Sequence, residues 1–383
     1  MGERIEEYRL SAAGEHRRMR VSGVVTASSL VIALAACSAG EEDDPAPSPA
    51  PTTASESTAP TTVPPTVDAE IVTEVNVPWG MVFDEDGTAL VAQRDDASIL
   101  AVEPDGTVTD LGVVEGVQPG GEGGLLGLAL SPDGSTLYAY LTSAEDNRVV
   151  SMVVEDDSLG PAEPVLTGID KANNHNGGAL LYDPADDVLF VATGDALQPD
   201  LAQDSSALEG KILRVTPDGE PAPGNPFDNE VWSIGHRNVQ GLAFDDDGRL
   251  WSSEFGDKGA DELNLIEAGA NYGWPVVEGE SDDERFAAPK VTWPTDEASP
   301  SGLAIVDDTA YLGALRGQRL WTVPLDGEQT GEPKAHLVEE YGRIRAVAAA
   351  PDGSLWIGTS NTDGRADPAG DDDRLLRLTV TQQ

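Results

Sequence analysis

Short apolar stretches alternate with tight polar turns along the chain from Ile71 onward. Six segments each contain an apolar run, an Asp-Gly or Asp-Asp turn, and a second apolar run rich in β-branched residues, which predicts a β-hairpin. The six turns contain Asp86, Asp133, Asp186, Asp247, Asp307 and Asp352. Long helical periodicity is missing between them, so the pattern predicts an all-β fold.

The spacing of the hairpins indicates how they are arranged. Repeats of roughly 40–50 residues with several strands each are typical of propeller blades, and longer gaps leave room for loops. Three units carry a further turn, at Asp105, Asp218 and Asp326, as expected if each blade holds two hairpins. We therefore predict a six-bladed β-propeller of four-stranded antiparallel blades. A β-sandwich or a pair of barrels is the alternative, although neither needs six copies of one hairpin.

The N-terminal region has a different composition. A basic segment, 17–20, precedes a largely apolar run, 21–36, that is too short to span a membrane as a helix. This is the pattern of an export signal. The run ends in Leu-Ala-Ala-Cys at Cys37, which resembles the lipobox of bacterial lipoproteins, whose cysteine is diacylated. We expect a lipid anchor on Cys37 and an extracytoplasmic protein attached to the bacterial cell membrane.

These features divide the chain into three parts. Residues 1–37 are the expected lipoprotein signal peptide, with Met19 as an alternative start. Residues 38–67 are rich in Pro, Thr and Ala and lack large apolar side chains, which predicts a disordered linker. Residues 68–383 form the expected propeller, which is long enough to bury a sizeable core.

Charge and cysteine content narrow the possible partners. The 383 residues include 69 Asp and Glu against 23 Lys and Arg, for a formal net charge of −46. This charge repels phosphate backbones, so we expect no nucleic-acid partner. A neutral sugar or a metal cation is compatible with it, and so is a role in solubility alone. The single cysteine, Cys37, excludes an internal disulfide.

Polar clusters lie where blades should begin. The first is Asn-Asn-His-Asn-Gly-Gly, with His175 just before the third hairpin. An imidazole has an ordinary pKa of about 6.5, which suits a general base. The alternative is a histidine that only caps the loop.

Three further clusters contain arginine. Their residues are Arg237, Asn238 and Gln240 in the first, Arg316 in the second, and Arg343 and Arg345 in the third. Residues two apart on a strand share a face, so Arg343 and Arg345 should act together. In a chain with few basic residues, this repetition predicts one planar anionic ligand held by charge-assisted hydrogen bonds. Pairing with the surplus carboxylates is the alternative.

A fifth cluster is rich in oxygen ligands. It runs from Glu-Phe-Gly-Asp to Asn-Tyr-Gly-Trp-Pro and includes Gly256, Asp257, Glu262 and Tyr272. Carboxylates and backbone carbonyls suit a hard cation such as Ca²⁺, although the spacing differs from that of an EF-hand. A solvated acidic loop is the alternative. Phosphate-binding loops, HExxH and CxxC motifs are missing from the sequence.

Taken together, the motifs resemble the glucose/sorbosone dehydrogenase family, which includes soluble glucose dehydrogenase and bacterial aldose sugar dehydrogenases that use pyrroloquinoline quinone (PQQ). The matching stretches include GEGGLLGLAL, HNGGALLYDP, GHRNVQGLAF, NYGWP and GRIRAVAAAPDG, within 77–378. The resemblance implies a six-bladed propeller and the cofactors PQQ and Ca²⁺. It also implies an aldose substrate and an external electron acceptor that the sequence does not identify.

The resemblance also implies a role for each cluster. His175 falls at the base that takes the proton of the anomeric hydroxyl while hydride passes to the quinone, and Glu122 falls at a substrate-binding position. The three arginine clusters fall at quinone contacts. Gly256 and Asp257 match residues whose carbonyls hold the cofactor-bound Ca²⁺, and Glu262 and Tyr272 match a second calcium site.

Four positions depart from the family pattern. Glu122 replaces a glutamine, Asn174 an aspartate beside the base, Ala179 an arginine and Arg316 a lysine. Two other functions are rivals. A non-catalytic propeller that binds a glycan or a protein would have little reason to keep both His175 and the Arg343/Arg345 pair. A propeller hydrolase would need a nucleophile or a carboxylate dyad, and no residue is marked as one.

Overall fold

The computed structural model describes residues 66–73, 75–155 and 158–380. The expected signal peptide, Cys37 and nearly all of the expected linker lie outside these residues. Among the described residues, no helix is long and apolar enough to cross a membrane.

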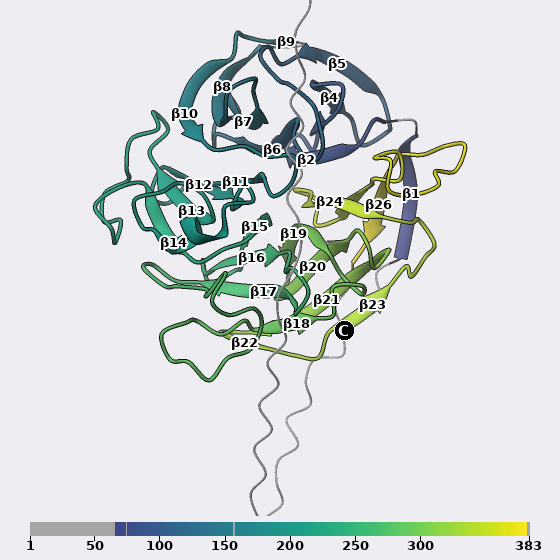
Figure 1. Ribbon diagram of the computed structural model, residues 1–383. Helices are drawn as coiled ribbons and strands as arrows, with labels where there is room; N and C mark the ends of the chain where they lie inside the picture. The colour runs from purple at the N-terminus through teal and green to yellow at the C-terminus, as the bar shows by residue number, and fades with distance from the viewer. Residues whose placement is uncertain (1–65, 74, 156–157, 381–383) are drawn as a thin grey trace, which may run out of the picture. The chain divides into compact units, whose positions relative to one another are not determined.

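Six antiparallel sheets make up the described chain, and each is one blade (Figure 1). The first blade holds β2 (Pro78–Phe83), β3 (Ala89–Gln93), β4 (Ser98–Val102) and β5 (Val108–Val113), and the second holds β6 (Leu125–Leu130), β7 (Thr136–Thr142), β8 (Asn147–Glu155) and β10 (Glu163–Ile169). The third blade holds β11 (Gly177–Asp183), β12 (Val188–Thr193), β13 (Lys211–Val215) and β14 (Val231–Ile234), and the fourth holds β15 (Val239–Phe244), β16 (Leu250–Glu254), β17 (Asp261–Ile266) and β18 (Val291–Trp293). The fifth blade holds β19 (Pro300–Val306), β20 (Thr309–Ala314), β21 (Arg319–Asp326) and β23 (Lys334–His336), and the sixth holds β24 (Ile344–Ala349), β25 (Leu355–Thr359), β26 (Arg374–Thr379) and β1 (Thr66–Thr73). Two short strands, β9 (Ser158–Leu159) and β22 (Gln329–Thr330), extend the second and fifth blades, and the 3-10 helix η1 (Pro199–Gln203) follows β12.

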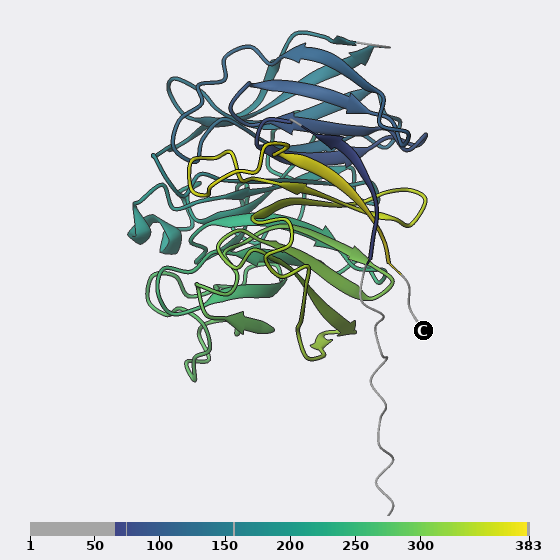
Figure 2. The same cartoon turned by 90° about the vertical axis from the view of Figure 1, so that its right-hand side faces the viewer.

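The first strand of each blade lies innermost, and these six strands form a closed ring. Each contacts the first strand of the next blade, and β2 contacts β24 to complete the circle. The sixth blade is finished by the N-terminal strand, because β1 pairs with β26 (Figures 1 and 2). This pairing ties the two ends of the propeller together without a disulfide.

The predicted all-β, six-bladed fold is confirmed. All six predicted Asp turns join the first and second strands of a blade, and each blade has the expected four strands. Strand β1 begins at Thr66, two residues before the expected start of the propeller.

The apolar core lies mainly between neighbouring blades. One buried cluster combines Leu90 and Ile99 of the first blade with Leu125 of the second. Another combines Phe190 of the third blade with Leu242 of the fourth. Burying one such side chain stabilises the fold by about 1.5–3 kcal/mol, so each blade depends on its neighbours.

Small residues occupy the third position of every inner strand: Gly80, Gly127, Ala179, Gly241, Gly302 and Ala346. A Cβ on Gly80, Gly127, Gly241 or Gly302 would lie 2.7 Å or less from backbone atoms of the next inner strand. These glycines therefore permit the close approach of the blades. The residues just before two of them, Gln240 and Ser301, hydrogen-bond to each other across blades at 3.0 Å.

Gly302→Val tests this close approach. A Cβ at Gly302 would lie 2.6 Å from both Arg345 O and Val347 N, so we expect a loss of about 3 kcal/mol in the free energy of unfolding. Denaturant-induced unfolding measures it. Gly370→Ala is the control, because nothing lies within 4 Å of its added Cβ. Equal stability of both variants would contradict the role of the small residues.

Candidate active site

The predicted site residues gather at one end of the ring. In an antiparallel blade, the loop before the first strand and the loop after the second lie at the same end. His175, Arg237 and Arg343 lie in loops before β11, β15 and β24, whereas Asp257 and Arg316 follow β16 and β20.

His175 is paired with a buried carboxylate. Its Nδ1 lies 2.8 Å from Oδ1 of Asp195, and the two side chains are 16% and 2% exposed. Asp195 also accepts hydrogen bonds from the indole of Trp274 at 2.8 Å and from the backbone of Leu197 at 2.9 Å. An ionised carboxylate only accepts, so we assign the proton of the imidazole to Nδ1. Nε2 then keeps its lone pair for a proton from another molecule.

The backbone around this pair is tightly constrained. His175 has a φ of 60°, a left-handed conformation that costs a non-glycine residue about 1 kcal/mol or more. Its carbonyl accepts a hydrogen bond from Ala196 N at 3.1 Å. A Cβ on Gly194 would overlap that carbonyl, so only glycine lets the end of β12 bring Asp195 to the imidazole.

Arg237 is linked to Asp195, the partner of His175, through one indole. Its guanidinium carbon lies 5.4 Å from the ring centroid of Trp274, the side chain that also binds Asp195. Its Nη1 donates to Phe255 O at 3.2 Å, and its Nη2 lies 3.5 Å from the carboxylate of Asp257.

Arg343 and Arg345 share one carboxylate. Their Nη2 atoms lie 2.9 and 3.5 Å from Oδ2 of Asp363, whose side chain is 1% exposed. Arg345 also donates to Oε1 of Gln240 at 3.4 Å and to Oγ of Ser360 at 3.1 Å. The structure therefore brings the predicted residues Gln240, Arg343 and Arg345 together.

Positive charge is concentrated here. Burial lowers the pKa of Arg345 to about 9, and the nearby charges of Arg94 and Arg343 act in the same direction. Burial acts to raise the pKa of Asp363, but Arg343 and Arg345 outweigh it, so this pKa lies below its ordinary value. One carboxylate thus faces two buried guanidinium groups.

Two buried donors near these groups have no acceptor among the described residues: Nε of Arg237 and Nδ2 of Asn238. The side-chain oxygen of Asn238 is used, since it accepts from Gly177 N at 3.0 Å. An unsatisfied buried donor costs about 1–3 kcal/mol. A surplus of donors and cations fits an anionic ligand rich in oxygen acceptors, as predicted for PQQ.

The predicted calcium residues are held mainly by protein contacts. Glu254, Glu262, Glu278 and Tyr272 line one small cavity. The carboxylate of Glu278 accepts from the backbone N–H groups of Asp257, Lys258 and Ala260. The Tyr272 hydroxyl donates to Leu265 O at 2.6 Å.

Burial and the neighbouring charge of Glu254 raise the pKa of Glu262. Nowhere in the described residues do three or more His, Cys, Asp or Glu side chains gather as a metal site. Carboxylates alone therefore do not form a calcium cage, and a cation at Gly256 and Asp257 would depend on backbone carbonyls.

Arg316 is the predicted site residue that the structure does not join to the others. It is exposed on the turn after β20. Glu122, by contrast, contacts the loop of His175: its carboxylate accepts hydrogen bonds from His175 N and Asn174 Nδ2, both at 2.9 Å, and lies 3.0 Å from Nη1 of Arg365.

Sequence reasoning missed Asp195, Trp274, Arg94, Asp363 and Arg365. A signal for Asp195 exists, because it follows the second strand of its blade in a Gly-Asp pair, as the predicted residue Asp257 does. Arg365 and Asp363 lie in the loop after β25, 360–373, where no motif marks them.

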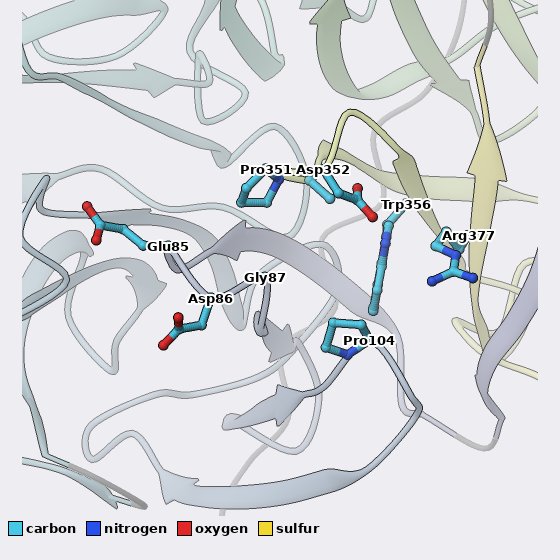
Figure 3. A pocket seen from close by; sticks show the side chains of 9 residues that line it. Glu85, Asp86, Gly87, Pro104, Pro351, Asp352, Trp356 and Arg377 are labelled. Atoms are coloured by element: carbon cyan, nitrogen blue, oxygen red, sulfur yellow. The ribbon is translucent and has the colours of Figure 1, made fainter.

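A separate cleft lies at the other end of the blades (Figure 3). Its volume is about 420 Å³, and it lies between the turns around Asp86 and Asp352, with Trp356 and Arg377 in its lining. The innermost strand of each blade begins at the end of the ring where the loops of His175 and the arginines lie. It ends at the opposite end, at turns such as those of Asp86 and Asp352. The cleft is therefore not part of the site.

Comparison with known proteins finds a matching family profile and several similar proteins. The glucose/sorbosone dehydrogenase family profile matches residues 75–377. The structure of a PQQ-bound aldose sugar dehydrogenase from Streptomyces coelicolor is 49% identical, covers 84% of this chain and 100% of its own, and superposes with a TM-score of 0.82.

Two curated relatives also match. Aldose sugar dehydrogenase YliI from Escherichia coli is 28% identical over 75% of this chain and 88% of its own length. Quinoprotein glucose dehydrogenase B from Acinetobacter calcoaceticus is 30% identical over 57% of this chain and 54% of its own length.

Asp363→Asn tests the charge balance of the site. Removing one partner of a buried ion pair leaves the arginines uncompensated, so we expect a loss of about 3 kcal/mol in the free energy of unfolding at neutral pH. The pKa of Asp363 lies below its ordinary 3.8. Its contribution is therefore present above about pH 4 and lost in acid, where the two proteins should converge.

Denaturant-induced unfolding at several pH values measures this difference. Asp283→Asn is the control, because it removes the partner of Arg285 from an exposed pair and should change little. A destabilisation of Asp363→Asn that stays constant or grows in acid would contradict the assignment.

Proposed function

The chain belongs to the glucose/sorbosone dehydrogenase family, and on this premise we propose that it is a PQQ-dependent dehydrogenase that oxidises an aldose at the anomeric carbon to the lactone. The observation that carries the proposal is the 2.8 Å contact of His175 with Asp195. It leaves Nε2 of the imidazole as a base at the end of the ring where the buried arginines gather.

His175 takes the proton of the anomeric hydroxyl in this reaction. Asp195 holds the ring in the tautomer with the proton on Nδ1 and stabilises the imidazolium that forms. The anomeric carbon loses its hydrogen as hydride, so the sugar is oxidised by two electrons. PQQ, when bound, supplies the two-electron acceptor.

Arg237, Asn238, Gln240, Arg343 and Arg345 would hold the cofactor. The unpaired donors on Arg237 and Asn238 and the two arginines that share Asp363 support this assignment, because carboxylates and quinone oxygens are acceptors. We extend the proposal to Arg316 on the family resemblance alone.

Ca²⁺ is the second proposed cofactor. The carbonyls of Gly256 and Asp257 would hold it beside the quinone, where a hard cation acts as a Lewis acid. The carboxylate of Asp257 lies 3.5 Å from the guanidinium of Arg237. This contact supports a calcium site next to the proposed PQQ site. Glu262 and Tyr272 remain a proposed second calcium site.

The anchor and the electron acceptor complete the proposal. Cys37 would attach the protein to the outer face of the bacterial cell membrane, and an external acceptor would reoxidise the cofactor.

The rival is a propeller that binds a glycan or a protein without catalysis. It gains no support from His175, because recognition alone does not need a histidine oriented by a buried carboxylate.

Reconstitution tests the proposed function. Protein mixed with PQQ and Ca²⁺ should reduce a dye when a panel of aldoses is supplied, and omission of Ca²⁺ should weaken this activity. His175→Ala should bind PQQ, measured by equilibrium titration, but lose about 100-fold or more in kcat. Full activity of His175→Ala, or PQQ binding without turnover on any aldose, would contradict the proposal.

Asp195→Asn tests the orientation of the base. The amide can donate to Nδ1 and so place the imidazole proton on Nε2, where it blocks the base. We expect kcat to fall about tenfold or more with PQQ affinity unchanged. Steady-state kinetics with the best aldose measure it, and unchanged kcat would show that Asp195 does not set the tautomer.

A further inference from the structure

Glu122 lies where loops from three blades meet, beside the candidate site. It belongs to the loop before β6, His175 precedes β11, and Arg365 lies in the loop 360–373 of the last blade. One carboxylate oxygen accepts from His175 N, and the other accepts from Asn174 Nδ2 and from Arg365 Nη1. A single carboxylate therefore connects the loop of the base to a residue 243 positions away.

The carboxylate is well enclosed but charged. The Glu122 side chain is 12% exposed, and that of Arg365 is 42% exposed. Burial acts to raise the pKa of Glu122, but the hydrogen bonds from His175 N and Asn174 and the charge of Arg365 outweigh it, so this pKa lies below its usual value. Glu122 is thus an anion at neutral pH, next to the loop that carries the base.

Three of the roughly four lone-pair positions of this carboxylate are used by protein donors. Little remains for a sugar hydroxyl, so the contacts suit a positioning role better than a primary role in substrate binding. His175 has a left-handed backbone conformation, with a φ of 60°. The hydrogen bond from its N–H to Glu122 helps to hold the backbone in that conformation.

The negative charge of Glu122 works against the role of His175 as a base. Negative charge near an imidazole favours its protonated form, which cannot accept a proton. The charged groups around His175 are Asp195, Glu122 and Asp257, with Arg365 on Glu122 and both Lys258 and Arg237 on Asp257. Without Arg365, the Glu122 carboxylate would lose its ion-pair partner, although the charge of Arg345, which also acts on Glu122, would remain.

We propose that Glu122 and Arg365 form a charge-balanced positioning pair for His175: Glu122 fixes the backbone of the base, and Arg365 cancels the negative charge that Glu122 brings. The inference rests on the proposed role of His175 as the base. Arg365 is a positioning residue, since it acts through Glu122.

The two residues have opposite charges, so their removal has opposite effects. Arg365→Ala leaves Glu122 uncompensated and should move the titration midpoint of the His175 imidazole upward by about half a pH unit. Glu122→Gln leaves the cation of Arg365 and should move it downward by a similar amount. The double variant and Arg365→Lys should both stay near the wild type.

NMR of the histidine Cε1–H groups in calcium-free protein without cofactor measures these midpoints, with a His175→Gln spectrum to assign the resonance. Arg285→Ala is the matched control, because it removes an arginine from an exposed pair with Asp283 and should leave the midpoint unchanged. Shifts of the two single variants in the same direction, or no shift in either, would overturn the proposal.

Activity gives a second measurement. In the reconstituted enzyme, the acid limb of the pH–rate profile should move with the NMR midpoint in each variant, and the double variant should restore its position. If the wild type oxidises no aldose, the proposed function fails, while the NMR titration of the cofactor-free protein still decides the role of the pair.

Discussion

The close approach of six inner strands is the constraint on which the rest of the structure depends. A glycine or alanine stands at the third position of every inner strand, and a Cβ on four of these glycines would lie 2.7 Å or less from backbone of the next strand. Only a narrow ring lets loops from different blades meet at one end. The contact of β2 with β24 closes that ring, and the pairing of β1 with β26 completes its last blade, so the site depends on both ends of the propeller.

Charge at the mouth of the ring is balanced locally although the chain as a whole is strongly acidic. Many carboxylates of the described residues lie on the exposed surface. The few beside the site are different: Asp195 orients a base, Asp363 compensates two buried arginines, and Glu122 is compensated by Arg365. Among the described residues, the buried donors Nε of Arg237 and Nδ2 of Asn238 have no hydrogen-bond acceptor. At these two donors the balance of the site is incomplete. An acceptor-rich anion would complete it.

The fold could be predicted because its signals are local. Each Asp turn between two apolar runs indicates a hairpin from a few neighbouring residues, and six copies indicate the number of blades. His175 and the arginines also stood out, because such side chains are rare in this sequence. Asp195 and Asp363 did not, because they are two among 69 acidic residues. The contact of Glu122 with Arg365 spans 243 positions and exists only once the ring has closed. Arg316 is exposed on the turn after β20, at the end of the ring that holds the other arginines, and its predicted role stays a prediction.

The most direct test of this account is a crystal structure of the protein with PQQ and Ca²⁺ bound. The account predicts a quinone at the end of the ring that holds His175, with carboxylates on Arg343 and Arg345, acceptors at Arg237 and Asn238, and Nε2 of His175 facing open space beside it. A quinone bound in the cleft near Trp356, or a mouth too narrow to admit it while His175 keeps its contact with Asp195, would contradict the account.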